Sequence, residues 1–354
     1  MKKRVFVLIC LMLTIPCQGR TITVDNDGPA DFNNIQAAIN NANNGDMVVV
    51  ADGIYTGNGN RDITLNKNIT VQSQNGPTNC IIDCQGSSGD EHYGFVASGS
   101  EPYCVVEGLT IMGGVTTNLS RGGGAAVGRY VKICNCIFRE NYAENGGGAI
   151  YVGAHCDGTG TEAINCTFVN NLVAGNGGGA VRIVGGTGDK ITLSNCISWA
   201  NSTPDLATQW SGKCGLPQIK AEFSILQIDW YNSNVIKENC ITADPCFADP
   251  CNGDYHLKSQ AGRWNPTSQT WVQDDVTSVA IDAGNPMDPV GLEPFPNGGI
   301  INMGAYGGTA EASKSYFGGP PCQTIVAGDI NGDCVIDFKD FGLMAFHWLD
   351  SNNP

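Results

Sequence analysis

The sequence predicts an all-β fold, a right-handed parallel β-helix, and three repeats between Gly122 and Asn201 carry the prediction. The segments GGGAAV, GGGAIYV and GGGAVRI each precede a tetrapeptide that begins with Asn-Cys. The repeated positions recur every 30 residues, as in Cys136, Cys166 and Cys196, in Asn135, Asn165 and Asn195, and in Asn141, Asn171 and Asn201. A fixed period of this size is typical of a solenoid, in which each repeat buries its apolar side by stacking on the next.

The residues inside one repeat indicate strands and corners. The apolar runs, such as AIYV, AVRI and ITL, are short and rich in β-branched residues, which favour strands. Glycine and asparagine separate these runs, and both suit corners that need a positive φ. No repeat contains a helical apolar period. Stacked coils about 4.8 Å apart would align matching positions into ladders, and right-handed crossovers are the rule.

Part of the chain resembles the pectin-lyase-like superfamily of right-handed parallel β-helices. The resemblance rests on GGGAI at Gly146–Ile150 and on the FxxN pattern at Phe138–Asn141 and Phe168–Asn171, and it extends over residues 21–310. It implies the fold and leaves function open, because this fold hosts lyases, hydrolases, epimerases and non-catalytic adhesins.

Residues 1–19 predict a signal peptide. Lys2, Lys3 and Arg4 precede an apolar run, Val5 to Ile15, that is too short to span a bilayer, and Gly19 is a small residue suited to cleavage. The alternative, a buried N-terminal strand, fits the flanking charges poorly. We therefore expect a protein that is secreted or held at the cell surface, without a membrane span.

The charge balance argues against nucleic acid and anionic membranes as partners. Loss of Lys2, Lys3 and Arg4 would leave 16 of the 19 basic residues against 34 acidic residues. Such a surface repels polyanions. A polyanionic sugar chain would then require Ca²⁺ to bridge the charges.

Fourteen of the 16 cysteines lie beyond the predicted signal peptide. In an exported protein they could form disulfides, and the local pairs Cys80–Cys84, Cys246–Cys251 and Cys322–Cys334 are the candidates. Cys136, Cys166 and Cys196 instead predict a reduced interior ladder, because parallel Cβ vectors suit disulfide torsions poorly. The absence of CxxC pairs argues against zinc.

Residues 20–243 are assigned to the β-helix, and its entry predicts one helix. Ile35, Ala38, Ile39 and Ala42 follow helical spacing, with Asp31 as the expected N-cap and a glycine after the end. This helix would cover the open first coil.

Residues 244–316 are richer in proline, glycine and aspartate. They resemble the closing segments of such β-helices in the motifs DPCF, DYHL, AIDAG and MGAYGG, and they are expected to cap the last coil. Within them, Trp264 and Trp271 could stack on sugars or cover the end of the core.

Residues 317–326 predict a linker, and residues 327–354 predict a calcium loop followed by a helix. Side-chain oxygens stand at loop positions 1, 3, 5, 9 and 12, with a backbone carbonyl at 7, which is a calcium-ligand spacing. The six expected ligands are Asp329, Asn331, Asp333, Val335, Asp337 and Asp340.

This tail resembles one repeat of a dockerin, which implies Ca²⁺ as a cofactor and a cohesin-like protein as a partner. It departs from that pattern in having Cys334 where glycine makes the turn, and in having one loop where a dockerin has two. The alternative is an acidic, solvated turn without metal.

The GGGA strands are the expected site. If Ile150 and Val152 point inward, Tyr151 points outward, and by the same alternation Arg182 does so on the next coil. Val127 would lie one coil before, and His155 and Asp157 lie in the adjoining loop. Tyr151 and Arg182 are the candidate sugar-binding pair, and Arg182, Asp157 and His155 are the candidate catalytic groups. The alternative is that Tyr151 and Arg182 are ordinary surface residues.

Two functions remain open from the sequence. A lyase would use Arg182 as base, but it also needs carboxylates or Ca²⁺ to acidify the proton next to a uronate carboxyl. A glycoside hydrolase needs paired acids across a cleft, and the acids of the central coils fall mostly in loops: Glu140, Glu144, Asp157, Glu162 and Asp189. The favoured function is therefore binding of extracellular polysaccharide or a cell-surface glycan. The alternative is a secreted polysaccharide lyase or glycoside hydrolase.

Overall fold

The computed structural model describes residues 19–99, 103–117, 122–153, 160–186, 188–210, 216–227, 234–318, 328–330 and 335–346. The predicted signal peptide, apart from Gly19, lies outside these residues. Within them, no helix combines the length and the apolar character needed to cross a bilayer.

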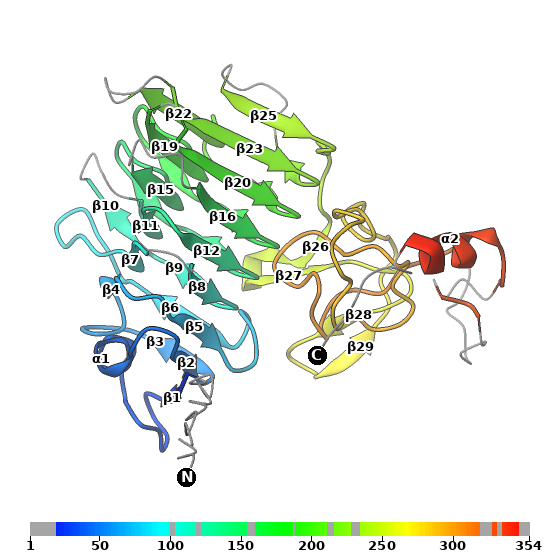
Figure 1. The fold of residues 1–354 in the computed structure, drawn as a ribbon, viewed down its shortest axis with the longest axis horizontal. Helices are drawn as coiled ribbons and strands as arrows, with labels where there is room; N and C mark the ends of the chain where they lie inside the picture. The colour runs from blue at the N-terminus through cyan, green and yellow to red at the C-terminus, as the bar shows by residue number, and fades with distance from the viewer. Residues whose placement is uncertain are drawn as a thin grey trace, which may run out of the picture.

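The chain winds into a right-handed parallel β-helix of about seven turns, as predicted. Each turn contributes a strand to a nine-stranded sheet, then to a seven-stranded sheet, then to a six-stranded sheet (Figure 1). Every neighbouring pair in these sheets is parallel, as in β12–β16 and β15–β19. Matching residues of successive turns therefore lie one above the other.

The strands fall into four stacks. The nine-stranded sheet contains β1 (Thr21–Val24), β2 (Met47–Val50), β5 (Thr70–Ser73), β8 (Cys104–Glu107), β12 (Val131–Cys134), β16 (Gly160–Ile164), β20 (Lys190–Ser194), β23 (Gln218–Glu222) and β25 (Val235–Glu238). The seven-stranded sheet contains β3 (Gly53–Tyr55), β6 (Cys80–Asp83), β9 (Thr110–Met112), β13 (Ile137–Arg139), β17 (Thr167–Val169), β21 (Ile197–Trp199) and β24 (Ile225–Leu226). The six-stranded sheet contains β4 (Ile63–Leu65), β7 (Phe95–Ala97), β11 (Ala125–Val127), β15 (Ile150–Gly153), β19 (Val181–Gly185) and β22 (Leu206–Trp210). A short fourth stack contains β10 (Val115–Thr116), β14 (Tyr142–Ala143) and β18 (Leu172–Val173).

The interior is a set of ladders. Phe138 and Phe168 stack with ring centroids 5.5 Å apart. The three ladder cysteines are buried free thiols, as predicted. The Sγ of Cys166 donates to the carbonyl of Ile133, one turn below, at 3.4 Å, and the Sγ of Cys196 donates to Ala163 at 3.3 Å. A thiol here fills core space and also satisfies a backbone acceptor.

Two expected disulfides are wrong, because Cys80, Cys84, Cys246 and Cys251 are free. The strand β6 separates Cys80 from Cys84, and four residues of extended chain span about 13 Å, well beyond a disulfide's reach. The strand β26 (Phe247–Asp249) separates the other pair in the same way. The third pair, Cys322–Cys334, lies outside the described residues.

Buried asparagines form a second ladder at one corner. The Oδ1 of Asn171 accepts from the Nδ2 of Asn141 at 3.0 Å, and Asn201 repeats this contact with Asn171 at 3.0 Å. At another corner Asn135, Asn165 and their equivalents adopt a positive φ near +50°, and Gly108 takes that place one turn earlier, as predicted.

A single helix, α1 (Ile35–Asn41), covers the first turn, and its Ile35, Ala38 and Ile39 join the core (Figure 1). The expected N-cap, Asp31, is wrong. The cap is Asn34, whose side chain accepts from the amide of Ala37 at 2.8 Å. Asp31 instead accepts from the amide of Thr23 at 2.9 Å and pins the loop to β1.

The C-terminal segment lies along the side of the solenoid and does not form the expected cap across its last turn (Figure 1). It contains β26, a 3-10 helix (Pro250–Asn252), β27 (Asp254–Leu257), β28 (Arg263–Asn265) and β29 (Thr270–Val272). Its apolar residues pack on outward side chains of the seven-stranded sheet, such as Ile137 and Ile197. This contact buries outward side chains of β13, β17, β21 and β24. The helix α2 (Phe338–Phe346) follows in the tail.

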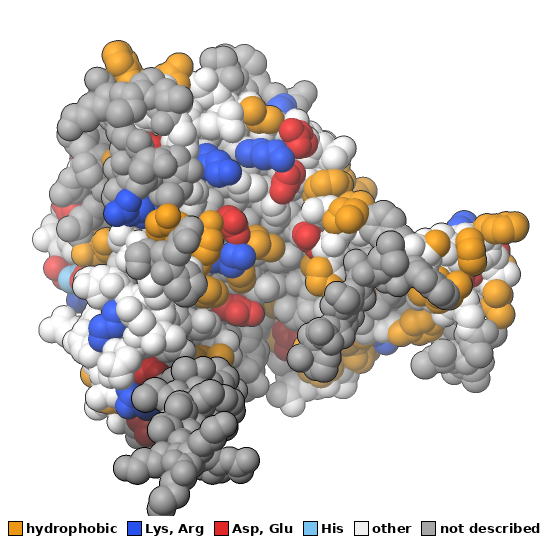
Figure 2. Space-filling model, viewed as in Figure 1, with side chains coloured by type: hydrophobic (Ala, Val, Ile, Leu, Met, Phe, Trp, Pro, Cys, Tyr) orange, Lys and Arg blue, Asp and Glu red, His pale blue; other side chains and the backbone are white. Residues whose placement is uncertain are grey.

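The nine-stranded sheet presents an open polar face, on which basic and acidic side chains alternate (Figure 2). Lys132 pairs with Glu162 at 3.1 Å, and Lys220 pairs with Glu222 at 2.7 Å and with Glu238 at 3.0 Å. The carboxylates of Glu162 and Glu238 pair across neighbouring strands, and that of Glu222 pairs within its own strand.

Candidate functional site

The register of the six-stranded sheet places Tyr151 and Arg182 on neighbouring turns, as the sequence predicted. Tyr151 pairs with Arg182, and Ala207 follows in the same outward row. Their neighbours Ile150, Val152, Val181 and Ile183 are buried in the core. The residue one turn before Tyr151 is Ala126 and not Val127, which is buried and belongs to the inward row.

The glycines ahead of these strands allow the chain to turn tightly into each strand. Gly147 and Gly178 form a parallel bridge. A Cβ at Gly147 would lie 1.8 Å from the carbonyl oxygen of Ile150, and one at Gly178 would lie 2.0 Å from that of Val181. No side chain fits at either position, so glycine is required where the chain turns into the strands that carry Tyr151 and Arg182.

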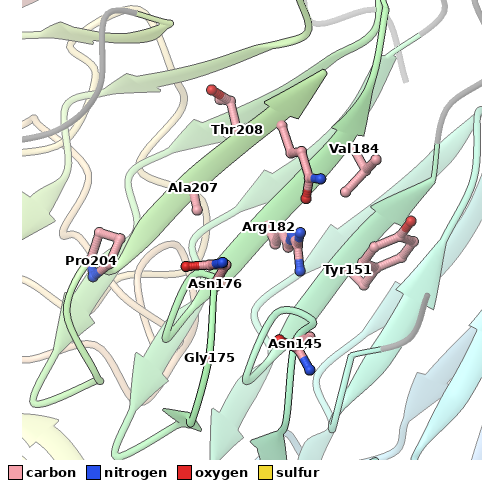
Figure 3. A pocket seen from close by; sticks show the side chains of 11 residues that line it. Asn145, Tyr151, Gly175, Asn176, Arg182, Val184, Pro204, Ala207 and Thr208 are labelled. Carbon is pink, nitrogen blue, oxygen red and sulfur yellow. The ribbon is translucent and has the colours of Figure 1, made fainter. Parts of the chain in front are cut away.

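Above this row the surface is hollowed over about 690 Å³. The hollow is lined by Asn145, Tyr151, Gly175, Asn176, Gly177, Arg182, Val184, Pro204, Ala207, Thr208 and Gln209. Figure 3 shows Arg182 at its centre, with Tyr151 and Asn176 on either side in this view. The lining combines one aromatic ring, one cation and several neutral hydrogen-bonding groups.

Arg182 is a buried cation that makes no ion pair with any residue in the described ranges. It is 7% exposed, and its Nη1 has no hydrogen-bond partner among the described residues. Burial lowers the pKa of its guanidinium, against a smaller opposing effect of Tyr151. Arginine stays charged even so. A buried donor without a partner has a high free energy, and a ligand acceptor in the hollow would satisfy it.

Carboxylates are absent from the described lining of the hollow. Glu162 pairs with Lys132 on the nine-stranded sheet, and the Oδ2 of Asp189 accepts from the amide of Gly186 at 2.9 Å. Glu140 and Glu144 are likewise not among the lining residues. The candidates His155 and Asp157 lie outside the described residues. Within the described part of the chain, the hollow is suited to bind hydroxyl and anionic groups, not to supply paired acids.

The sequence interpretation missed four polar residues of the hollow. Asn145 and Asn176 each stand directly before a glycine triplet, so their shared position in two repeats was a usable signal. Thr208 and Gln209 belong to β22, which joins the six-stranded sheet without a preceding glycine triplet and carried no such signal.

The predicted calcium loop is described in part. Asn331 and Asp333 lie outside the described residues. Asp340 is buried, and its two oxygens accept from the amides of Ile330 at 2.7 Å and Asp337 at 2.8 Å. Asp329 is buried as well, and Val335 is exposed. The first and last loop positions are therefore buried carboxylates, and this oxygen chemistry fits calcium.

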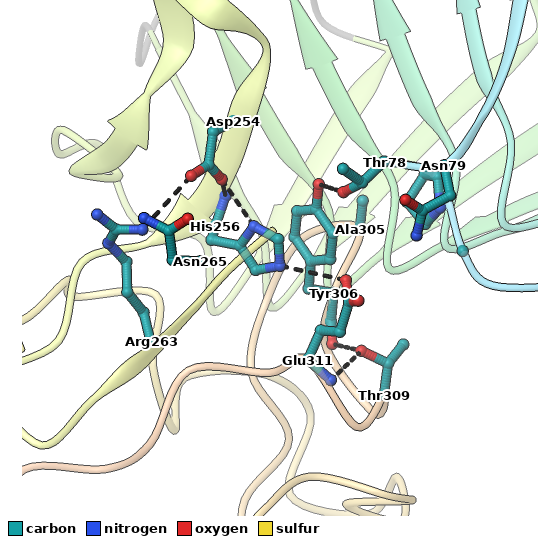
Figure 4. Close-up of polar contacts among 12 residues, drawn as sticks. Thr78, Asn79, Asp254, His256, Arg263, Asn265, Ala305, Tyr306, Thr309 and Glu311 are labelled. Carbon is teal, nitrogen blue, oxygen red and sulfur yellow. Dashed lines mark hydrogen bonds and ion pairs between the residues drawn. The ribbon is translucent and has the colours of Figure 1, made fainter. Parts of the chain in front are cut away.

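A separate polar cluster joins the C-terminal segment to the solenoid (Figure 4). His256 is fully buried, its Nδ1 lies 2.7 Å from Asp254, and its Nε2 lies 3.4 Å from a Glu311 oxygen. Its ring stacks on that of Tyr306 at 3.6 Å. The hydroxyl groups of Tyr306 and Thr78 lie 2.7 Å apart. This arrangement fastens the segment to an early turn.

A family model described as "Disaggregatase related" matches residues 229–284, which is a minor part of the chain. No curated protein matches. One solved structure that matches is a pectin methylesterase variant in complex with a hexasaccharide, at 13% identity and a TM-score of 0.32. The alignment covers 61% of this chain and 66% of that one, so the chain spans just under two thirds of its length.

The stacked parallel turns described above define the fold class. The chain is a parallel β-helix.

Proposed function

We propose that this β-helix is an exported protein that binds extracellular polysaccharide or a cell-surface glycan in the hollow above Tyr151 and Arg182. The observation that carries the proposal is the buried guanidinium of Arg182, whose Nη1 has no hydrogen-bond partner among the described residues, at the centre of an otherwise neutral polar lining. An acidic sugar group would supply the missing acceptor through a charge-assisted hydrogen bond.

The other lining groups support a sugar ligand. Tyr151 offers an aromatic ring, and aromatic rings pack against the apolar faces of sugars. Asn145, Asn176 and Gln209 offer both donors and acceptors, which suit hydroxyl groups. Because Tyr151 and Arg182 lie one turn apart, a sugar chain that contacts both would run along the solenoid axis.

The second candidate function is catalysis by a polysaccharide lyase. The observation that favours it is the position of the Arg182 guanidinium at the centre of the hollow, where it could neutralise the uronate carboxyl next to the proton that a lyase removes. A glycoside hydrolase is less well supported, since the described lining holds no carboxylate pair.

The tail extends the proposal. Asp329 and Asp340, with the remaining predicted ligands, would hold one Ca²⁺ ahead of α2. A cohesin-like protein is the proposed partner of the tail. Export through the N-terminal segment would give a secreted or surface-held protein.

The test is calorimetric titration of the purified protein, in buffer with added Ca²⁺, with polygalacturonate, alginate and a neutral xylan. The same mixtures are followed for unsaturated uronides and for new reducing ends. We expect binding of the acidic chains, weaker binding of xylan, and no turnover.

Arg182→Met and Tyr151→Ala should each weaken binding, while Lys190→Met, which removes a cation on another sheet, should not. Turnover that disappears in Arg182→Met would replace the binding proposal with the lyase. Equal binding by the Arg182→Met variant would overturn both.

Calcium binding is tested separately by titrating Ca²⁺ into the protein and into Asp329→Ala. One tight site that disappears in the variant is expected. Identical titrations of the two proteins would exclude this loop as the site.

A further inference from the structure

A second hollow lies on another face of the molecule, where the C-terminal segment passes the corner between the nine-stranded and seven-stranded sheets. It measures about 470 Å³. One wall is formed by the corner around Gln72, Gln74 and Glu107, and the other by residues 308–311 together with Leu292. It shares no lining residue with the hollow above Arg182.

The hollow lies where the row of corner asparagines ends and a glycine takes their position. On the upper turns, corner asparagines hold the C-terminal segment in contact. The Nδ2 of Asn165 donates to the carbonyl of Asn302 at 2.8 Å, and that of Asn135 donates to Gly307 at 2.8 Å. On the next turn down the corner residue is Gly108, which has no side chain to make this contact. The segment therefore passes this corner with an open space beneath it.

One carboxylate in this hollow lacks a partner. Glu107 is half-buried and makes no ion pair or side-chain hydrogen bond within the described part of the chain, and burial raises the pKa of its carboxyl. The other acid of the lining, Glu311, is paired with His256 at 3.4 Å. No lysine, arginine or histidine belongs to the described lining. Glu107 thus presents a negative charge that the protein leaves uncompensated.

The groups beside Glu107 are amides. Gln72 is its partner on the neighbouring strand, and Gln74 lies two residues further along the chain. Their side chains are not hydrogen-bonded to any described residue. Free amides offer donors and acceptors to hydroxyl groups, and the exposed Leu292 offers an apolar edge.

We propose that this second hollow binds an amino sugar, with the ammonium group on Glu107 and the sugar hydroxyls on Gln72 and Gln74. A bare divalent cation fits less well, because calcium needs six to eight oxygen ligands. No cluster of three metal-binding side chains occurs among the described residues. A carboxylate with neutral amides around it is suited to one positive charge on a hydroxylated ligand.

The experiment titrates the full chain with a glucosamine tetramer, and with its N-acetylated counterpart as the matched ligand without ammonium groups. We expect the free-amine tetramer to bind and the N-acetylated tetramer to bind about tenfold more weakly or worse, the loss of one charge-assisted hydrogen bond. Glu107→Gln, which keeps the side-chain shape, should produce the same loss. Glu238→Gln, which removes a carboxylate elsewhere on the same sheet, should not.

Equal affinity for the two tetramers, undiminished binding by Glu107→Gln, or no binding of the free amine would each overturn the proposal. Arg182→Met serves to separate the two hollows, because it should weaken acidic polysaccharide and leave the glucosamine tetramer unaffected. Loss of both ligands in Arg182→Met would mean a single shared site and would also contradict the proposal.

Discussion

Tyr151 and Arg182 occupy the same outward position on neighbouring turns, and no residue that the structure describes accepts a hydrogen bond from the buried Nη1 of Arg182. An unpaired buried charge destabilises the folded protein. Arg182 therefore lowers the stability of the free protein, and a ligand acceptor that pairs with its guanidinium would offset this loss.

Arg182→Met is expected to separate stability from binding. Methionine keeps the apolar stem that packs in the hollow and removes the unpaired charge. We expect the Tm to rise by about 2–4 °C, corresponding to about 1 kcal/mol, while binding of polygalacturonate weakens. Differential scanning calorimetry and calorimetric titration measure the two effects. Lys190→Met, an exposed lysine on β20, is the matched control and should change neither. A fall in Tm with binding retained would contradict the interpretation.

Asn171→Ala is expected to cost stability on the order of 3 kcal/mol, because it leaves several buried groups unpaired. The Oδ1 of Asn171 accepts from both nitrogens of Asn141, at 3.2 and 3.0 Å, and its Nδ2 donates to the carbonyl of Phe138 at 2.9 Å. Urea unfolding measures the loss. The control is Asn176→Ala, an exposed asparagine in the next corner loop, which should unfold as the parent does. Equal midpoints for the two variants would show that the ladder adds nothing.

The sequence predicted the solenoid correctly because its 30-residue period fixes the stacking. Once Ile150 and Val152 are placed in the core, the alternation of a strand leaves Tyr151 outside, and the same step leads to Arg182. The same reasoning was wrong for Val127. The strand after the first glycine triplet begins directly after it, whereas the strand after the second triplet begins one residue later. Local patterns also failed to distinguish Asn34 from Asp31 as the helix cap, because both residue types satisfy the rule.

Long-range packing could not be predicted from these patterns. The C-terminal segment lies along the side of the solenoid because Asn135 reaches Gly307, 172 positions later, and Thr78 reaches Tyr306, 228 positions later. Neither contact has a periodic signature. For the same reason the second hollow could not be predicted, because its walls come from segments far apart in the chain.

Ala200→Gly is expected to stabilise the protein. Ala200 has a φ of +55°, at the corner where the preceding turns carry Asn170 and Glu140. A left-handed conformation destabilises an alanine by about 1–2 kcal/mol. Glycine removes this strain but loses more backbone entropy on folding, so only part of the strain energy is recovered. We expect a gain of roughly 0.5–1 kcal/mol in urea unfolding. Ala207→Gly, in the extended strand β22, is the control and should lose stability instead. A loss in both variants would contradict the strain at Ala200.

The C-terminal segment is expected to lose stability as pH rises. Burial raises the pKa of Glu293 to about 8, although its Oε1 accepts from the amides of Asn302 and Gly308, each at 2.8 Å. Between the unfolded pKa of about 4.3 and this value, the folded carboxyl keeps a proton that the unfolded chain has lost, so stability falls with rising pH. Asp282 acts in the same direction, because burial raises its pKa to about 7.

His256 adds to this dependence. Burial lowers its pKa, but the hydrogen bonds to Asp254 and Glu311 outweigh burial and raise it. A raised histidine pKa contributes stability that is complete below the unfolded value of about 6.5 and is lost as pH rises through the folded value. We expect the Tm to decline steadily from pH 5 to pH 9. Glu293→Gln keeps an oxygen for the two amides and removes the titrating proton, so its decline should be shallower. A parallel decline in parent and variant would show that Glu293 does not titrate in this range, and a Tm that rises with pH would contradict all three assignments.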